Sequence, residues 1–203
     1  MELSKTLTDI ERMVEELFRV NDKPYLLYHN INHTRNVVKR AQEIAANYAV
    51  ANENLFVLLV AAWFHDTGHL FGSLDKHEEM SVYIMRMYLV DMVNERMLDS
   101  IDNCILATLI TAKPVTLIEK ILCDADTYHF GTSEFHQTDP IVWLELEKRL
   151  GKNIPGKDEK SLHLLELHTF YTHYCITHLS QGKQENMAWL KHKIAGSESF
   201  RNS

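Results

Sequence analysis

The chain has 203 residues, of which 45% are hydrophobic and 24% are charged, with seven glycines and four prolines. This composition is that of a folded globular protein, and it excludes the disordered and fibrous classes. Lys and Arg total 21 against 28 Asp and Glu, which gives a formal charge of −7. The sequence contains no run of basic residues. We therefore expect no nucleic-acid partner.

No membrane or export signal is visible in the sequence. Residues 1–20 are polar and helical in pattern. They lack the basic start, apolar stretch and small-residue cleavage site that follow one another in a signal peptide. The longest apolar run, Leu55 to Phe64, is shorter than the roughly 18 to 20 residues that cross a bilayer. Three cysteines, Cys104, Cys123 and Cys175, lie far apart and suit a reducing compartment. We expect a cytoplasmic protein that does not contact membranes, and the sequence is compatible with a homo-oligomer.

Apolar residues recur at helical spacing along most of the chain, and no segment alternates with period two for long. The first predicted helix contains Leu7 to Phe18, with Thr6 or Thr8 as its cap. The second begins near Asn30 and runs to Tyr48. Further helices are predicted over residues 53–66, 76–92, 94–111, 116–130, 141–150, 159–179 and 183–194. We predict an all-α fold, a helical bundle with a carboxy-terminal helical extension.

We expect a single domain over residues 1–203. The residues that carry chemistry fall within about 28–130, and a helical extension follows over about 131–200. Residues 151–160, GKNIPGKDEK, form the most linker-like stretch because of their glycines and proline. This stretch can separate a core from a carboxy-terminal helical pair.

Titratable side chains follow two of the most apolar predicted helices. His65 and Asp66 come directly after ten apolar residues, where a buried carboxylate without partners is costly. A divalent cation would offset that cost. Asp124 and Asp126 end another apolar helix. Because they are two residues apart, their side chains point in different directions from the helix. We therefore expect one of these two carboxylates to face a site.

Two histidines stand at the start of the second predicted helix. His29 and His33 are four residues apart and share a face if the helix extends back to His29. Each histidine taken alone is better explained as an ordinary core or surface residue. Together they favour a metal site, because a histidine, the His65–Asp66 pair and an aspartate lie on three separate apolar helices. Imidazole and carboxylate ligands suit Mn, Ni, Co, Fe, Zn or Mg and do not select one of them.

In chain order, His33, then His65 with Asp66, then Asp126 resemble the H…HD…D signature of the HD superfamily, a group of all-α metal-dependent phosphohydrolases. Residues 28–37 are similar to the YHNxxHxxxV segment of its cyclic-nucleotide phosphodiesterases. AAWFHDTGH is similar to their HDxxH segment, and residues 74–78 are more loosely similar to their LENHH stretch. The resemblance covers about residues 28–130.

The resemblance implies roles for individual residues. His33, His65, Asp66 and Asp126 would bind a divalent ion, and His29 would act as the general acid. Asp66 would orient the attacking water. From its position four residues after His65, His69 would support the ligands or meet substrate phosphate, with an ordinary polar loop residue as the alternative. His77 and Glu78 would support the first ion or bind a second one, and they are explained equally well as ordinary residues that open the next helix. Independently of the resemblance, we expect Arg35 and Lys113 to be solvated charges by default, with a phosphate contact as the alternative for either.

Departures from the family pattern narrow the expected activity. Residues 94–115 contain no histidine, although dinuclear HD proteins, including iron oxygenases, carry one there. The chain also lacks the pocket region that follows the last Asp in cyclic-nucleotide phosphodiesterases. The resemblance thus implies a phosphohydrolase acting on a small phosphorylated substrate, with a nucleotide as one candidate. The alternatives are a cyclic-nucleotide or dinucleotide phosphodiesterase, and an HD domain that binds metal or nucleotide without turnover.

Overall fold

The computed structural model describes residues 3–72 and 74–201. Within these ranges the chain forms α-helices and short 3₁₀ helices and no strand, which confirms the predicted all-α fold. None of the helices in this part of the chain is long and apolar enough to span a membrane. The α-helices are α1 (Leu3–Val20), α2 (Ile31–Ala45), α3 (Asn52–Phe64), α4 (His77–Leu89), α5 (Glu95–Leu106), α6 (Leu117–Asp126), α7 (Phe135–Leu150), α8 (Lys157–Leu167) and α9 (His173–Arg201).

The helices fall into two compact units, the first ending at Asp126 and the second beginning at Thr127. Helices α1 to α6 belong to the first unit and α7 to α9 to the second. The division falls close to the end of the signature region in the sequence. The linker-like stretch at 151–160 contains the turn between α7 and α8, where Gly151 and Gly156 both have positive φ angles. Every candidate site residue lies in the first unit.

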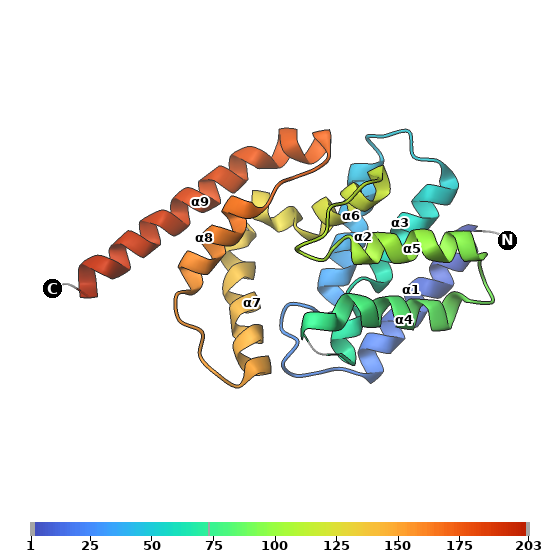
Figure 1. The fold of residues 1–203 in the computed structure, drawn as a ribbon, viewed down its shortest axis with the longest axis horizontal. Helices are drawn as coiled ribbons and strands as arrows, with labels where there is room; N and C mark the ends of the chain where they lie inside the picture. Colours follow the sequence, from blue (N-terminus) through green and yellow to red (C-terminus); the bar gives the residue numbers. More distant parts are fainter. Residues whose placement is uncertain (1–2, 73, 202–203) are drawn as a thin grey trace. The chain divides into compact units, whose positions relative to one another are not determined.

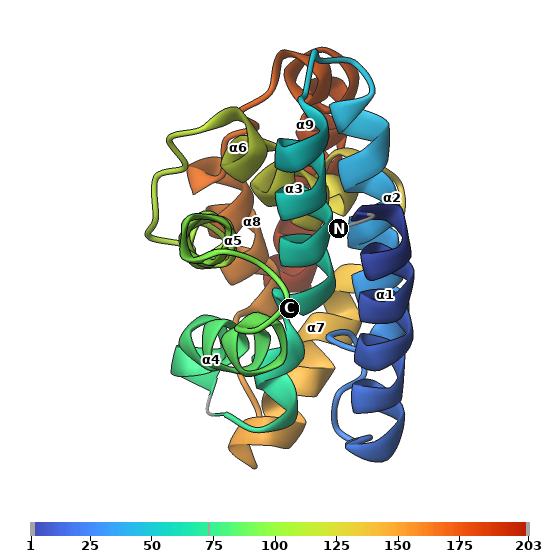
Figure 2. The same ribbon diagram turned by 90° about the vertical axis from the view of Figure 1, so that its right-hand side faces the viewer.

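Helix α3 is the centre of the first unit. It lies between α1 and α2 on one side and α4, α5 and α6 on the other (Figures 1 and 2). All residues from Phe56 to Phe64 are buried, because neighbouring helices surround this helix. A helix that is apolar all round is one that packs on every side. Its carboxyl end, where His65 and Asp66 follow, therefore lies inside the unit.

Helices α2 and α6 pack against α3 and against each other. The α2 helix begins at Ile31 because Asn30 caps it, accepting hydrogen bonds from the backbone N–H groups of Asn32 and His33. The buried face of α2 carries His33 at its amino end and apolar residues further along. The α6 helix ends at Asp126. The packing thus brings the amino end of α2 and the carboxyl ends of α3 and α6 together.

The second unit differs most from the sequence prediction. The predicted helix over 159–179 is broken, because α8 ends at Leu167 and α9 begins at His173, where the Thr172 hydroxyl accepts the N–H of Cys175. Helix α9 continues through Gly182, which lies in the gap between the predicted helices 159–179 and 183–194. A Cβ at Gly182 would lie 2.0 Å from the Gly131 carbonyl oxygen. This glycine therefore permits close packing and does not end the helix.

Candidate metal centre

Four side chains from three helix ends converge inside the first unit. The Nε2 atom of His33 lies 3.1 Å from Oδ1 of Asp126 and 3.3 Å from Oδ2 of Asp66. The Nε2 atom of His65 lies 3.3 Å from the same Asp66 oxygen and 3.6 Å from the same Asp126 oxygen. Two imidazole nitrogens and two carboxylate oxygens thus face one another, the mixed donor set that suits a divalent ion.

The hydrogen bond of His65 fixes which ring nitrogen faces the cluster. Its Nδ1 lies 2.8 Å from the carbonyl oxygen of Ala62, which can only accept, so Nδ1 carries the proton. When the ring is neutral, as a metal ligand must be, the lone pair of Nε2 points toward Asp66. This is the arrangement in which a backbone carbonyl orients a metal-binding histidine.

Two buried atoms at the centre of this cluster have no hydrogen-bond partner among the described residues, Nε2 of His65 and Oδ2 of Asp66. Their side chains are 1% and 6% exposed, and their contact with each other lacks hydrogen-bond geometry. Buried polar atoms nearly always have a hydrogen-bond partner. The lack of one at both atoms indicates that a further group binds between them. His33, His65 and Asp66 offer ligand atoms that all lie within 4.8 Å of one another. The residues present therefore fit a divalent ion.

A second group of side chains surrounds the other oxygen of Asp66. The Nε2 atoms of His69 and His77 lie 3.8 and 4.0 Å from Oδ1 of Asp66. The rings of these two histidines stack at 3.9 Å, and His77 Nε2 lies 3.2 Å from a carboxylate oxygen of Glu78. His29, Asp66 and His69 form a second set of ligand atoms within 4.8 Å of one another. Asp66 therefore connects two groups of histidines through its two oxygens.

His29 reaches this second group from outside helix α2. The sequence placed it on one helix face with His33 only if the helix extended back to His29, and this condition is not met, because the helix begins at Ile31 after the extended cap residue Asn30. Its ring still lies 4.4 Å from that of His69 and 5.9 Å from that of His33. The loop before α2 therefore places His29 at the centre, where a helical backbone was expected to place it.

The charges of the cluster shift the pKa values of its members. Burial lowers the pKa of His33, but its contacts with Asp126 and Asp66 outweigh burial and raise the pKa to about 9. Burial opposes ionisation of His65 as well, yet the charge of Asp66 and the contact with Asp126 raise its pKa well above the ordinary value. Burial acts to raise the pKa of Asp66, and His65 and His33 hold it well below its usual range. Two protons in this protein thus occupy positions that a divalent ion can replace.

A polar latch holds the loop after α3 against α4. The hydroxyl of the buried Ser81 donates to the carbonyl oxygen of His65 at 2.6 Å and accepts the N–H of Gly68 at 2.8 Å. A Cβ at Gly68 would lie 1.9 Å from the carbonyl oxygen of His77, so only glycine allows this approach. The latch therefore fixes His65 and His77 relative to each other. Sequence reasoning missed Ser81, although a serine on the buried face of an apolar helix was a visible signal.

A cavity of about 370 Å³ opens onto the centre. Its lining includes His29, Asp66 and Asp126 from the cluster and His77 with Glu78 from the start of α4. The remaining lining comes from the residues just before α4 and from the loop after α5: Leu74, Asp75, Thr108, Leu109 and Ile110. The volume suits a small molecule. Sequence reasoning included residues 74–78 in a motif but did not identify Asp75 as part of a site.

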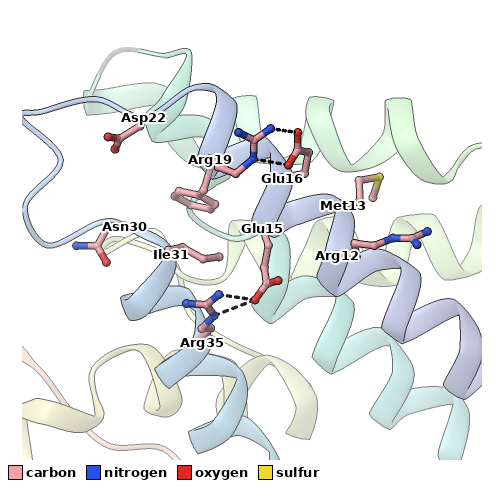
Figure 3. Close-up of a pocket in the computed structure, with 10 residues that line it drawn as sticks. Arg12, Met13, Glu15, Glu16, Arg19, Asp22, Asn30, Ile31 and Arg35 are labelled. Atoms are coloured by element: carbon pink, nitrogen blue, oxygen red, sulfur yellow. Dashed lines mark hydrogen bonds and ion pairs between the residues drawn. The ribbon is translucent and has the colours of Figure 1, made fainter.

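A second cavity, of about 770 Å³, lies between α1 and the start of α2 (Figure 3). Arg35 lines it and donates two hydrogen bonds to Glu15, at 2.9 and 2.6 Å, while Arg19 pairs with Glu16. Among the described residues, neither Arg35 nor Lys113 lines the metal-centre cavity, which agrees with the solvated or surface-paired charge expected by default for both. The Arg35 guanidinium is engaged by a carboxylate of α1 instead.

Comparison with known proteins supports the assignment of this region. No curated protein and no solved structure matches the chain. A family model described as the HD domain matches residues 30–131, which include His33, His65, Asp66 and Asp126. This match covers half of the chain and spans all three helix ends that meet at the centre. The chain therefore belongs to the HD-domain family, whose members are typically metal-dependent hydrolases.

Proposed function

We propose that the protein is a metal-dependent phosphohydrolase that cleaves a phosphate ester of a small molecule. The observation that carries this proposal is the convergence of His33, His65, Asp66 and Asp126 around buried atoms without hydrogen-bond partners, at the wall of a cavity of small-molecule size. These four side chains would hold the divalent ion. Membership of the HD-domain family supports the same chemistry.

When bound, a divalent ion lowers the pKa of a water ligand toward neutrality and offsets charge on a phosphoryl oxygen. Asp66 has a buried carboxylate with one oxygen in the cluster and the other directed at His69 and His77. It is thus suited to accept a hydrogen bond from the attacking water and to orient it toward phosphorus. His69 and His77 would hold Asp66 in this orientation.

The leaving alkoxide needs a proton, and we assign its donation to His29. A protonated imidazole can act as a general acid. His29 lines the cavity and lies beside His69, outside the set of four proposed ligands. A proton donor in this position would contact the substrate, while the four proposed ligands would remain free to bind the ion.

His77 and Glu78 are proposed to support the centre from the second side of Asp66. If they act as ligands, together with Oδ1 of Asp66, the protein binds two ions per chain. If they only hydrogen-bond to water around the first ion, it binds one. Elemental analysis of the purified protein distinguishes these outcomes by stoichiometry, and His77→Gln lowers the count from two to one only in the first case.

The function is tested by metal content and phosphate release measured on the same samples. We expect activity to vanish with a chelator and to return with Mn, Co, Ni or Mg. His65→Ala and Asp66→Asn should abolish both metal binding and turnover. Asp22→Asn, which removes a carboxylate from the wall of the other cavity, serves as the control and should keep both.

The substrate panel contains alkyl and aryl phosphates, nucleoside monophosphates, cyclic nucleotides and cyclic dinucleotides. Preferred turnover of the cyclic compounds would favour the phosphodiesterase alternative. Nucleotide binding without product release with any of the four metals would favour a non-catalytic HD domain. Full metal content in both site variants would contradict the proposed ligands.

A further inference from the structure

The wall of the metal-centre cavity has two parts of different chemistry. Asp66 and Asp126 belong to the histidine cluster and form the part that would meet a phosphate. The other part carries apolar side chains from two segments, Leu74 from before α4 and Leu109 with Ile110 from the loop after α5. The volume of about 370 Å³ lies in the range of pockets that hold a whole small molecule. The alcohol part of a phosphate ester would therefore contact the apolar part of the wall.

This apolar part of the wall offers few hydrogen bonds to a substrate. The Thr108 hydroxyl also lines the cavity, but it donates its proton to the Ile105 carbonyl at 2.8 Å. The backbone N–H groups of Thr108 and Leu109 donate to the carbonyls of Ile105 and Leu106. Asp75 lines the cavity too, and it is already engaged by another group of the protein. A polyhydroxylated alcohol would thus give up hydrogen bonds to water for few replacements, which costs free energy.

Ile110 is the side chain that an apolar substrate would cover most. It is 81% exposed, more than any other large apolar side chain in the described part of the chain. Exposed apolar residues that are scattered singly are common, but this one lines the cavity together with Leu74 and Leu109. Removing apolar surface from water stabilises a complex in proportion to the area buried. An alkyl chain that extends from the phosphate along this wall would bury part of Ile110 and gain affinity with its length.

We propose that the site prefers phosphate monoesters of apolar alcohols, with straight alkyl chains as the simplest examples, and that Ile110 is the residue that recognises the chain. This inference rests on the proposed phosphohydrolase function. Water attacks phosphorus, the bond between phosphorus and the ester oxygen breaks, and the alcohol leaves with a proton from His29. The four proposed ligands act on the phosphate of every such ester alike. Selection among esters therefore falls to the wall around the alcohol part.

The first test measures kcat/KM of the manganese-loaded protein for ethyl, butyl and hexyl phosphate. Their leaving alcohols are chemically similar, so differences report the binding of the chain. We expect a rise of about two- to fourfold for each methylene that contacts the wall, where the upper figure corresponds to complete transfer of one methylene out of water. 2,3-Dihydroxypropyl phosphate, compared with propyl phosphate, tests the shortage of hydrogen-bonding groups. We expect the propyl ester to be the better substrate.

Ile110→Ser should lower the ratio of hexyl to ethyl kcat/KM about three- to tenfold, because it removes apolar surface that the longer chain covers. Val115→Ser is the matched control. Val115 is also branched at Cβ and is 77% exposed on the same loop, but it is not among the described residues that line the cavity. The control should keep the ratio of the unchanged protein.

Calorimetric binding of ethyl-, butyl- and hexylphosphonate to the manganese-loaded protein gives a readout without turnover, because these compounds have no ester bond. If none of the esters is cleaved, the proposed function fails, and the order of the phosphonate affinities still decides this inference. Equal values along the alkyl series, a preference for the dihydroxypropyl ester, or the same change of ratio in both serine variants would overturn it.

Discussion

At the scale of single residues, Asp66 and His29 occupy different positions at the same centre. Asp66 directs one oxygen at His33 and His65 and the other at His69 and His77. The ring of His29 lies closest to that of His69 on the second side, at 4.4 Å, and 5.9 Å from that of His33. Loss of Asp66 should therefore disturb the whole centre, whereas loss of His29 should disturb one step of the reaction.

His29→Ala is expected to lower turnover of an alkyl phosphate about 10²- to 10⁴-fold, the usual contribution of a general acid. Metal content should stay near that of the unchanged protein. An aryl phosphate with a good leaving group departs without a proton, so its turnover should fall much less. The measurement compares kcat for both esters at matched metal occupancy. Equal losses for the two esters, or loss of metal with His29, would remove this residue from the acid role.

At the scale of elements, the centre depends on how the loop after α3 is held against α4. The Ser81 hydroxyl satisfies one carbonyl and one N–H of that loop, at His65 and Gly68. Periodicity predicts the helices on either side, because their buried faces are regular. It does not predict the latch, because the two groups that Ser81 joins are backbone atoms whose positions depend on tertiary packing.

Ser81→Ala should destabilise the protein by about 1–3 kcal/mol, the cost of leaving buried hydrogen-bonding groups unsatisfied. Because the latch positions His65, metal affinity should also fall by about 10- to 100-fold. Urea denaturation and metal titration measure the two effects. Ser100→Ala is the control, since its hydroxyl donates to the Arg96 carbonyl one turn away on α5 and lies outside the centre. If both variants show the same stability and affinity, the latch has no role.

At the scale of the whole molecule, the sequence predicted what depends on composition and local pattern. The all-α fold and the meeting of His33 with His65, Asp66 and Asp126 were accessible, because the signature residues lie at the ends of helices whose apolar faces must be buried together. The continuous helix through Gly182 was not accessible, because that glycine is required by contact with Gly131, far away in the chain. The position of Asp75 at the cavity wall was equally hidden, since it depends on how α4 and the loop after α5 are placed in space.

The whole molecule also responds to the protons held at the centre. The pKa of His33 is raised from 6.5 to about 9 in this protein, and that of His65 is raised in the same direction. A raised folded-state pKa gives stability that is fully present below about pH 6.5 and is lost as the pH rises through about 9. Metal-free protein should therefore lose stability over this window, by at most about 1.4 kcal/mol per pH unit for each proton released.

A bound divalent ion replaces these protons, so the metal-loaded protein should lack this loss, and metal affinity should rise across the same window. Urea denaturation of chelator-treated and manganese-loaded protein at pH 6.5, 7.5 and 8.5 measures the difference. His33→Asn removes one of the titrating groups and should flatten the pH dependence of the metal-free protein. Equal slopes for the metal-free and metal-loaded forms would mean that the ion does not occupy the position of these protons, and the ligand assignment of His33 and His65 would then fail.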